Sequence, residues 1–365
     1  MNLADITLQS FRLLLLPFAL IYGIIIRIRN GLYDRNILSS TSFNLPVICV
    51  GNLSVGGTGK SPMIEYLIRL LKEEYQLAVL SRGYKRKTKG YVLANNQTTA
   101  LEIGDEPMQF YQKFPGVSIA VGEERVESVP QLLQDCPDTE MILLDDAFQH
   151  RSIAPGFSIL LTDANNLFTR DFFLPTGDLR DEKSSYKRAD AIVVTKCKPG
   201  FSEADRKQIM KEIRIMPHQH LYFSMIEYGL PYHILNTKQT GILDKETEVL
   251  LITGIANSEP LKKYLEQRTW AYENLSFSDH HIFSIDDLSV IRSSYEKLTQ
   301  SKKMILTTEK DAVRLIKFGE VLQELPLYVV PIRHKILFDQ EAEFREQLLS
   351  FITTFPKKSQ VQPHA

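Results

Sequence analysis

The sequence has few cysteines, no excess of charge of either sign, and no internal repeat or low-complexity segment. Its three cysteines, Cys49, Cys136 and Cys197, are scattered over 365 residues without C-x-x-C spacing. This usage argues against a disulfide framework and a structural zinc site, and it fits a reducing compartment. Forty-three basic residues stand against forty-four acidic ones, so no overall field favours nucleic acid as a partner.

Long apolar runs are also absent, apart from one stretch at 13–26 that is flanked by arginines. As a helix it would be about 21 Å long, whereas a bilayer core is roughly 30 Å thick. No small-residue cleavage site of a secretory signal follows it. We therefore expect residues 1–30 to form a helix at a membrane interface, with its arginines among anionic headgroups. A buried core helix is the alternative, because such lengths are common inside proteins.

A glycine-rich segment follows an apolar run at 47–50. It matches the phosphate-binding loop G-x-x-x-x-G-K-[ST], except that Ser54 stands at the first glycine. In such a loop backbone N–H groups converge on phosphate oxygens, Lys60 reaches the outer phosphates, and Ser61 offers a hydroxyl to Mg²⁺. The segment predicts a nucleoside triphosphate site, and a plain glycine-rich turn is the alternative. The loop residues are Ser54, Val55, Gly56, Gly57, Thr58, Gly59, Lys60 and Ser61.

Short apolar runs alternate with helical patterns along the rest of the chain, which is typical of an α/β protein with a parallel sheet flanked by helices. We expect a P-loop NTPase-type domain at 31–221, a β-ribbon or hinge at 222–247, a smaller α/β domain at 248–355 and a disordered tail at 356–365. The expected strands of the first domain are 47–50, 77–80, 117–121, 141–144, 157–161 and 191–195.

Two adjacent acids, Asp145 and Asp146, end the apolar run at 141–144. In NTPases an acidic element at such a position holds Mg²⁺ or its water opposite the phosphate loop. Adjacent side chains alternate in direction, so one acid can face the metal and the other the neighbouring loop. The alternative is that both cap the following turn.

A second acidic pair, Asp105 and Glu106, lies in a Gly-Asp-Glu-Pro turn ahead of a helix that begins near Pro107. Acids in this position often only stabilise the helix N-terminus. In the second domain, the run Asp279-His280-His281 could position a proton acceptor. A zinc site is less favoured there, because no third ligand stands at a recognisable spacing.

Several basic side chains fall at or beyond the ends of predicted strands, which is the binding edge of a doubly wound sheet. Because Arg forks suit phosphates, their number favours a second, anionic substrate, although each alone could form a surface salt bridge. The run 195–198 resembles the guanine-reading N-K-x-D element, but Lys198 occupies the Asp position, which favours ATP over GTP. The basic residues are Arg82, Arg125, His150 and Arg180.

Taken together, these segments resemble the tetraacyldisaccharide 4'-kinase family, the lipid A 4'-kinases of Gram-negative bacteria. The resemblance extends over nearly the whole chain, and Ser54 fits because the family carries Ser or Thr there. Two departures are Ala147, which replaces a common Gly, and Asp181, where many members have Glu. The matching segments are 51–52, 55–62, 81–84, 104–107, 145–150, 174–180, 279–280 and 308–313.

The resemblance implies transfer of the ATP γ-phosphate to the 4'-hydroxyl of a tetraacylated glucosamine disaccharide 1-phosphate at the cytoplasmic face of the inner membrane. It implies that Asp105 is the base, that His280 assists it, and that Lys60 and Ser61 hold phosphate and Mg²⁺. It also implies metal contacts by Glu106, Asp145 and Asp146. The implied acceptor contacts are Arg82, Arg125, His150, Arg180 and Asp181.

Two other functions compete with this interpretation. A membrane-associated P-loop ATPase that drives assembly or transport, without phosphorylating a lipid, explains the phosphate loop but gives no role to the Arg set or to His280. A non-catalytic lipid-binding module leaves Lys60 and Ser61 unexplained. The sequence identifies no protein partner.

Overall fold

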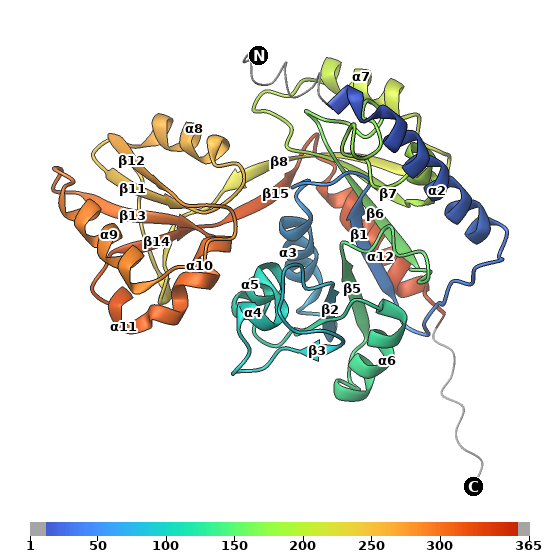
Figure 1. Ribbon diagram of the computed structural model, residues 1–365, viewed down its shortest axis with the longest axis horizontal. Helices are drawn as coiled ribbons and strands as arrows, with labels where there is room; N and C mark the ends of the chain where they lie inside the picture. The colour runs from blue at the N-terminus through green and yellow to red at the C-terminus, as the bar shows by residue number, and fades with distance from the viewer. Residues whose placement is uncertain (1–11, 357–365) are drawn as a thin grey trace, which may run out of the picture.

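The computed structural model describes residues 12–356, so residues 1–11 of the expected N-terminal helix and nearly all of the expected tail lie outside the described part of the chain. Each of two α/β domains is built on its own sheet, and two strands connect the sheets (Figure 1).

The first sheet is mainly parallel, and all six strands expected in it are present. They are β1 (Val47–Asn52), β2 (Leu77–Ser81), β4 (Ser118–Val121), β5 (Met141–Asp145), β6 (Phe157–Asp163) and β7 (Ala191–Thr195). These strands are buried on both faces, which is why they are continuous apolar runs rather than alternating ones. In the register of the sheet, Val50 lies opposite Asp145 and Ile159.

Three further strands complete this sheet: β3 (Val92–Leu93), β8 (His220–Tyr228) and β15 (Ile332–Ile336). The order is β15-β8-β7-β6-β1-β5-β2-β4-β3, with β3 and β15 antiparallel to their neighbours. The carboxyl ends of β1, β2 and β5 therefore meet at one edge of the sheet, as the phosphate-loop interpretation requires.

Helices cover both faces of the first sheet. On one face, apolar side chains of α3 (Lys60–Leu71), α5 (Asp105–Lys113) and α12 (Glu341–Thr354) form one core. On the other face, α6 (Arg125–Asp135) and α7 (Glu203–Ile213) contribute to a second core. A short helix, α4 (Ala100–Ile103), precedes α5, and a 3₁₀ helix, η1 (Lys183–Arg188), precedes β7.

The second sheet has six strands in the order β10-β9-β14-β13-β11-β12. Helices α9 and α10 pack on one of its faces and α8 packs on the other. Its strands are β9 (Tyr232–His233), β10 (Asn236–Thr240), β11 (Glu248–Thr253), β12 (Ala271–Ser276), β13 (Lys303–Thr308) and β14 (Leu327–Val330). Its helices are α8 (Glu259–Arg268), α9 (Ile285–Glu296), α10 (Glu309–Leu315), η2 (Ile316–Phe318) and α11 (Gly319–Leu322).

The expected extent of the second domain, 248–355, needs a correction at its C-terminal end. After β14 the chain returns to the first domain, where β15 pairs with β8 and the apolar face of α12 joins the core around α3. The expected hinge at 222–247 also begins inside β8, a strand of the first sheet. The connection between the domains is thus a pair of antiparallel strands, because β8 leads into the second sheet and β15 leads back.

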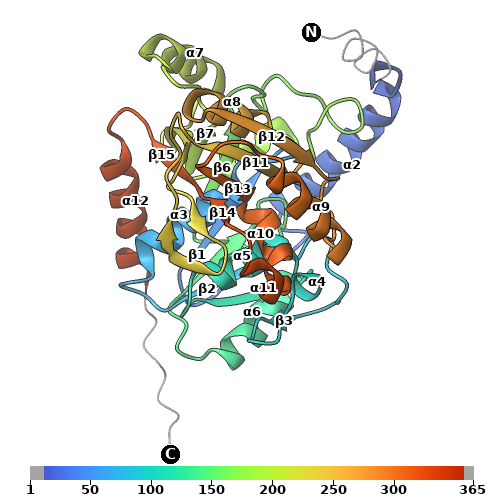
Figure 2. The same cartoon turned by 90° about the vertical axis from the view of Figure 1, so that its left-hand side faces the viewer.

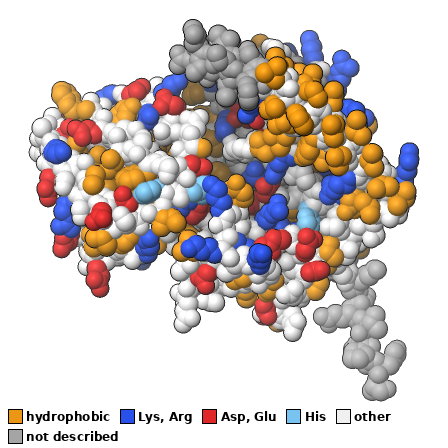
Figure 3. All heavy atoms as spheres, viewed as in Figure 1, with side chains coloured by type: hydrophobic (Ala, Val, Ile, Leu, Met, Phe, Trp, Pro, Cys, Tyr) orange, Lys and Arg blue, Asp and Glu red, His pale blue; other side chains and the backbone are white. Residues whose placement is uncertain are grey.

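The N-terminal helix α2 (Leu16–Asp34) lies on the surface rather than in the core. Ala19, Gly23 and Asn30 are buried against the first domain, whereas Ile24 and Ile25 are exposed by 53% and 58%. Hydrophobic side chains gather over this helix in Figure 3, and Figure 2 shows α2 and α12 on opposite sides of the molecule. Within residues 12–356 no helix has both the length and the apolar character needed to span a membrane.

Candidate active site

The phosphate loop connects β1 to α3. Gly59 has φ = +88°, and a Cβ atom there would lie 3.0 Å from the ring of His334, so only glycine fits. Ser54, in contrast, has a negative φ and forms an antiparallel bridge with Leu179. The first loop position therefore needs no glycine, which explains the departure from the common pattern.

Lys60 shares its acceptors with Arg180. Its Nζ lies 3.3 Å from Oδ1 of Asn52 and 3.7 Å from Oδ1 of Asp146. Arg180 donates to the same two oxygens at 2.5 and 2.6 Å. Burial alone would raise the pKa of Asp146, but Lys60 and Arg180 outweigh it and hold the pKa below its usual value. Asp146 is therefore a carboxylate between two cations at the mouth of the phosphate loop.

Asp145 lies at the end of β5. One of its carboxylate oxygens accepts a hydrogen bond from Ser81 at 2.9 Å, and the other, Oδ1, is buried without a partner. Burial, reinforced by the charge of Asp146, raises the pKa of Asp145 to about 6. A buried carboxylate oxygen without a donor fits a site for a cation. No cluster of three or more His, Cys, Asp or Glu suited to a metal exists among residues 12–356.

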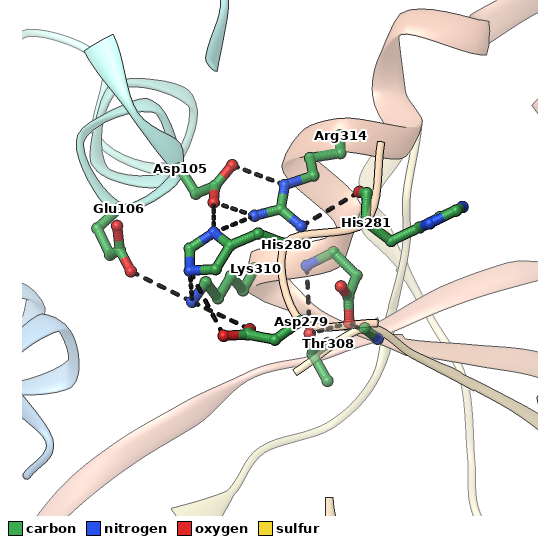
Figure 4. Close-up of polar contacts among 10 residues, drawn as sticks. Asp105, Glu106, Asp279, His280, His281, Thr308, Lys310 and Arg314 are labelled. Atoms are coloured by element: carbon green, nitrogen blue, oxygen red, sulfur yellow. Dashed lines mark hydrogen bonds and ion pairs between the residues drawn. The ribbon is translucent and has the colours of Figure 1, made fainter. Parts of the chain in front are cut away.

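Asp105 is the first residue of α5, and it meets the second domain directly (Figure 4). Nε of Arg314, on α10, donates to Oδ1 of Asp105 at 2.7 Å, and a second guanidinium nitrogen donates to Oδ2. His280 places Nδ1 2.7 Å from the same Oδ2. Burial would raise the pKa of Asp105, but the hydrogen bonds and charge of Arg314, with those of His280, lower it. Asp105 is therefore kept ionised.

Charged side chains surround both ring nitrogens of His280. Its Nδ1 lies 2.7 Å from Oδ2 of Asp105 and 2.6 Å from a guanidinium nitrogen of Arg314, and its Nε2 lies 3.2 Å from Nζ of Lys310. Lys310 also lies 3.4 Å from Glu106 and 3.9 Å from Asp279. His281 points elsewhere and pairs with Asp287 at 2.9 Å (Figure 4). Only His280 of the two adjacent histidines belongs to the cluster.

Glu106 connects this cluster to the phosphate loop, because its charge contributes to the raised pKa of Asp145. The acids predicted from two separate motifs thus lie close enough to interact. Together with Lys60 and Lys310, they lie where the two domains meet.

The expected acceptor contacts divide into two groups. Arg82 is exposed, and His150 and Arg180 are half-buried. The other two are buried. Arg125 is 2% exposed, and its guanidinium donates to backbone carbonyls, including that of Asp145 at 3.4 Å.

Asp181 is the second of these and is 1% exposed. It accepts from Asn30 of α2 at 2.8 Å and from Arg188 at 3.1 Å. Asp181 therefore links the N-terminal helix to the first domain, and its expected contact with the substrate stays a prediction.

Several residues around the site were given no role by the sequence motifs considered above. Thr195 donates to the carbonyl of Thr58 at 2.8 Å, and His334 contacts the carbonyl of Gly59 at 2.9 Å. Both approach the phosphate loop from its buried side. Arg314 directly follows the 308–313 segment, but nothing in its local pattern reveals that its partner is Asp105. Only the packing of the two domains brings these residues together.

Comparison with known proteins places this chain in one family. The sequence model of the family described as Tetraacyldisaccharide-1-P 4'-kinase matches residues 11–353. Curated proteins named tetraacyldisaccharide 4'-kinase include one from Flavobacterium johnsoniae, 45% identical, covering 94% of this chain and 98% of its own length. Another, from Bacteroides thetaiotaomicron, is 44% identical and covers 93% of this chain and 92% of its own length.

A solved structure agrees with these sequence matches. The crystal structure of the "apo" form of LpxK from Aquifex aeolicus in complex with ATP is 28% identical and has a TM-score of 0.73. The match covers 94% of this chain and 99% of the Aquifex chain. The chain belongs to the tetraacyldisaccharide-1-P 4'-kinase family.

Proposed function

We propose that the site where the two domains meet transfers the γ-phosphoryl group of ATP to the 4'-hydroxyl of a tetraacylated disaccharide 1-phosphate. The observation that carries this proposal is the 2.7 Å contact between Asp105 and His280, beside a phosphate loop with a complete Gly-Lys-Ser end. The names of the curated relatives support the same reaction, and so does the complex of the Aquifex aeolicus relative with ATP.

The phosphate loop and Lys60 hold the triphosphate. Backbone N–H groups of the loop and the N-terminus of α3 face the phosphates, and Lys60 leaves Asn52 and Asp146 to reach the outer ones. Asp145, with its unpartnered Oδ1, Ser61 and the nearby Asp146 and Glu106 would hold Mg²⁺. Bound there, Mg²⁺ would neutralise charge on the transferring phosphoryl group.

The Asp105–His280 pair accepts the proton of the attacking hydroxyl. Asp105 is ionised and shares its Oδ2 with Nδ1 of His280, so the pair takes up one proton as a unit. Phosphoryl transfer depends mainly on positioning and on cations around the transferring group. Lys60 comes from the first domain and Lys310 from the second, so domain closure would bring both to the phosphoryl group.

The acceptor approaches from the side of α2. Arg82, His150 and Arg180 supply donors for an anionic glycolipid. The hydroxyl of Tyr22, on α2, donates to the backbone of Arg180 at 2.9 Å, so the exposed isoleucines of α2 lie next to an acceptor contact. We propose that this face rests on the cytoplasmic surface of the inner membrane, where the acyl chains of the acceptor remain in lipid.

Incubation of the purified chain with labelled ATP, Mg²⁺ and a tetraacyldisaccharide 1-phosphate tests the reaction. We expect a labelled lipid 1,4'-bisphosphate, and we expect Lys60→Ala to abolish it. ATP turnover without a labelled lipid would instead identify a membrane-associated ATPase, and no ATP turnover under any condition would identify a lipid-binding module.

A further inference from the structure

The buried side of the phosphate loop contacts a histidine from the far end of the chain. His334 lies on β15, 275 residues after Gly59, and is 5% exposed. Its Nε2 lies 2.9 Å from the carbonyl oxygen of Gly59, and its Nδ1 lies 3.0 Å from Oγ of Ser224 on β8. Both ring nitrogens therefore have a partner. Neither His334 nor Ser224 has a role in the proposed proton or phosphoryl transfer.

The two partners fix which nitrogen carries the proton. A carbonyl oxygen only accepts, so Nε2–H donates to Gly59 and Nδ1 accepts from the Ser224 hydroxyl. Burial lowers the pKa of His334 to about 4, so the ring is neutral at physiological pH. A neutral ring with a fixed tautomer makes this contact independent of pH in the neutral range.

The direction of the Gly59 carbonyl matters for phosphate binding. A trans peptide is planar and its C=O and N–H point in opposite directions, so holding the Gly59 oxygen inward points the N–H of Lys60 outward. The same oxygen accepts the first hydrogen bond of α3, from the N–H of Met63 at 3.1 Å, so His334 is its second donor. The preceding carbonyl, of Thr58, is held in the same way by Thr195 at 2.8 Å. The ring of His334 also fills the space where a Gly59 side chain would lie. Two buried side chains thereby help to orient consecutive peptides of the loop.

We propose that His334 is a positioning residue for the phosphate loop, delivered by the strand that returns from the second domain. Only Pro331 separates β15 from β14 of the second sheet. The N–H of Ile332, at the start of β15, donates to Glu309 of α10 at 3.2 Å. The contact between His334 and Gly59 thus lies on the connection between the two domains. On this proposal it affects the binding of ATP and not the binding of the acceptor. The inference rests on the proposed use of ATP.

Two substitutions of similar size separate a positioning role from a merely structural one. In His334→Gln the amide nitrogen lies where Nε2 lies and can still donate to Gly59, whereas in His334→Asn it lies near the position of Nδ1 and cannot reach. His220→Asn, on the exposed part of β8, is the control. Affinity for ATP is measured by calorimetry on the full chain in detergent, and KM is measured for both substrates.

We expect His334→Asn to weaken ATP binding and to raise KM for ATP by roughly 3- to 10-fold, the worth of one hydrogen bond. His334→Gln should stay within about twofold of wild type, and KM for the acceptor should not change in either variant. Equal losses in both variants, or equal losses for ATP and acceptor, would contradict the proposal, as would unchanged ATP binding in His334→Asn. If His334→Asn fails to fold, Ser224→Ala tests the same contact, with a loss of about twofold for ATP alone.

These outcomes are distinct from failure of the proposed function. A wild-type chain that binds no ATP would overturn the proposed function itself. A wild-type chain that binds ATP, with no difference between the Gln and Asn variants, would overturn only the role of His334.

Discussion

Nδ1 of His280 lies 2.7 Å from Oδ2 of Asp105, although the two residues are 175 positions apart and belong to different domains. Arg314 binds the same carboxylate from α10. The candidate active site is therefore assembled only when the two domains are in contact. On the proposed role of this pair, the second domain contributes to the reaction although it has no phosphate loop.

Substitution of either member of this pair should lower turnover without unfolding the chain. We expect Asp105→Asn or His280→Ala to reduce kcat by roughly 10²–10⁴-fold, the usual worth of a positioned proton-transfer group. His281→Ala is a matched control, because the neighbouring ring pairs with Asp287 outside the cluster. Steady-state kinetics of the three variants check this expectation. A loss in the His281 variant equal to that in the His280 variant would contradict it.

Arg314 and Asp105 should depend strongly on each other in their contributions to the free energy of unfolding. Arg314 is 9% exposed, so Arg314→Met leaves a buried carboxylate without its main partner, which costs about 3–5 kcal/mol. Adding Asp105→Asn should recover part of this loss, with a coupling of about 1–3 kcal/mol. Urea denaturation of the two single variants and the double variant measures the coupling. Additive losses would mean that the pair contributes nothing across the domain interface.

Glu309, at the interface between the domains, should make stability fall as pH rises. Burial raises its pKa from 4.5 to about 7, with the charge of Glu65 adding to the rise and Lys113 opposing it. The folded state therefore binds this proton more tightly than the unfolded chain does, and its contribution is complete below the unfolded pKa and lost as pH passes through 7.

The neutral isostere should remove this dependence. In Glu309→Gln the unfolding free energy should fall less between pH 5 and 8, by about 1–3 kcal/mol, while Lys113 keeps Glu65 as a partner. Glu320→Gln, at an exposed acid of α11, is the control. Denaturation curves at several pH values provide the test. The prediction fails if wild type and Glu309→Gln show parallel pH profiles.

The exposed face of α2 should determine membrane binding. Ile25 and Ile285 are each 58% exposed, but only Ile25 lies on α2. We expect Ile25→Asp to reduce sedimentation with anionic phospholipid vesicles several-fold, because a charge on this face opposes insertion into the acyl boundary. Ile285→Asp should bind as wild type does, and ATP binding should be unchanged in both. Equal vesicle binding by the two variants would reject α2 as the contact.

Much of the first domain could be predicted from the sequence, because its parallel strands are buried on both faces and are therefore continuous apolar runs. The phosphate loop and the acids at the end of β5 were also predictable, since their chemistry depends on local spacing. The destination of α12 was not, because an amphipathic helix does not reveal which sheet it covers. Arg125 and Asp181 were expected at the substrate, but both side chains are buried. Their burial depends on the packing of the whole domain, which a local pattern does not reveal.

The contacts that define the site's geometry were the least predictable. Arg314 binds a carboxylate 209 residues away, and His334 binds a carbonyl 275 residues away. Neither belongs to a spacing pattern, because each depends on how the second domain and the strand that returns from it pack on the first. Local sequence carries no record of such pairings.

The most direct test of the central claim is the kcat for lipid bisphosphate formation by the double variant Asp105→Asn/His280→Ala, beside the two single variants. Residues that act as one unit lose their function together, so we predict that the double variant is no slower than the slower single variant. Losses that multiply in the double variant would mean that the two residues act independently, and would contradict a site in which both domains share one proton acceptor.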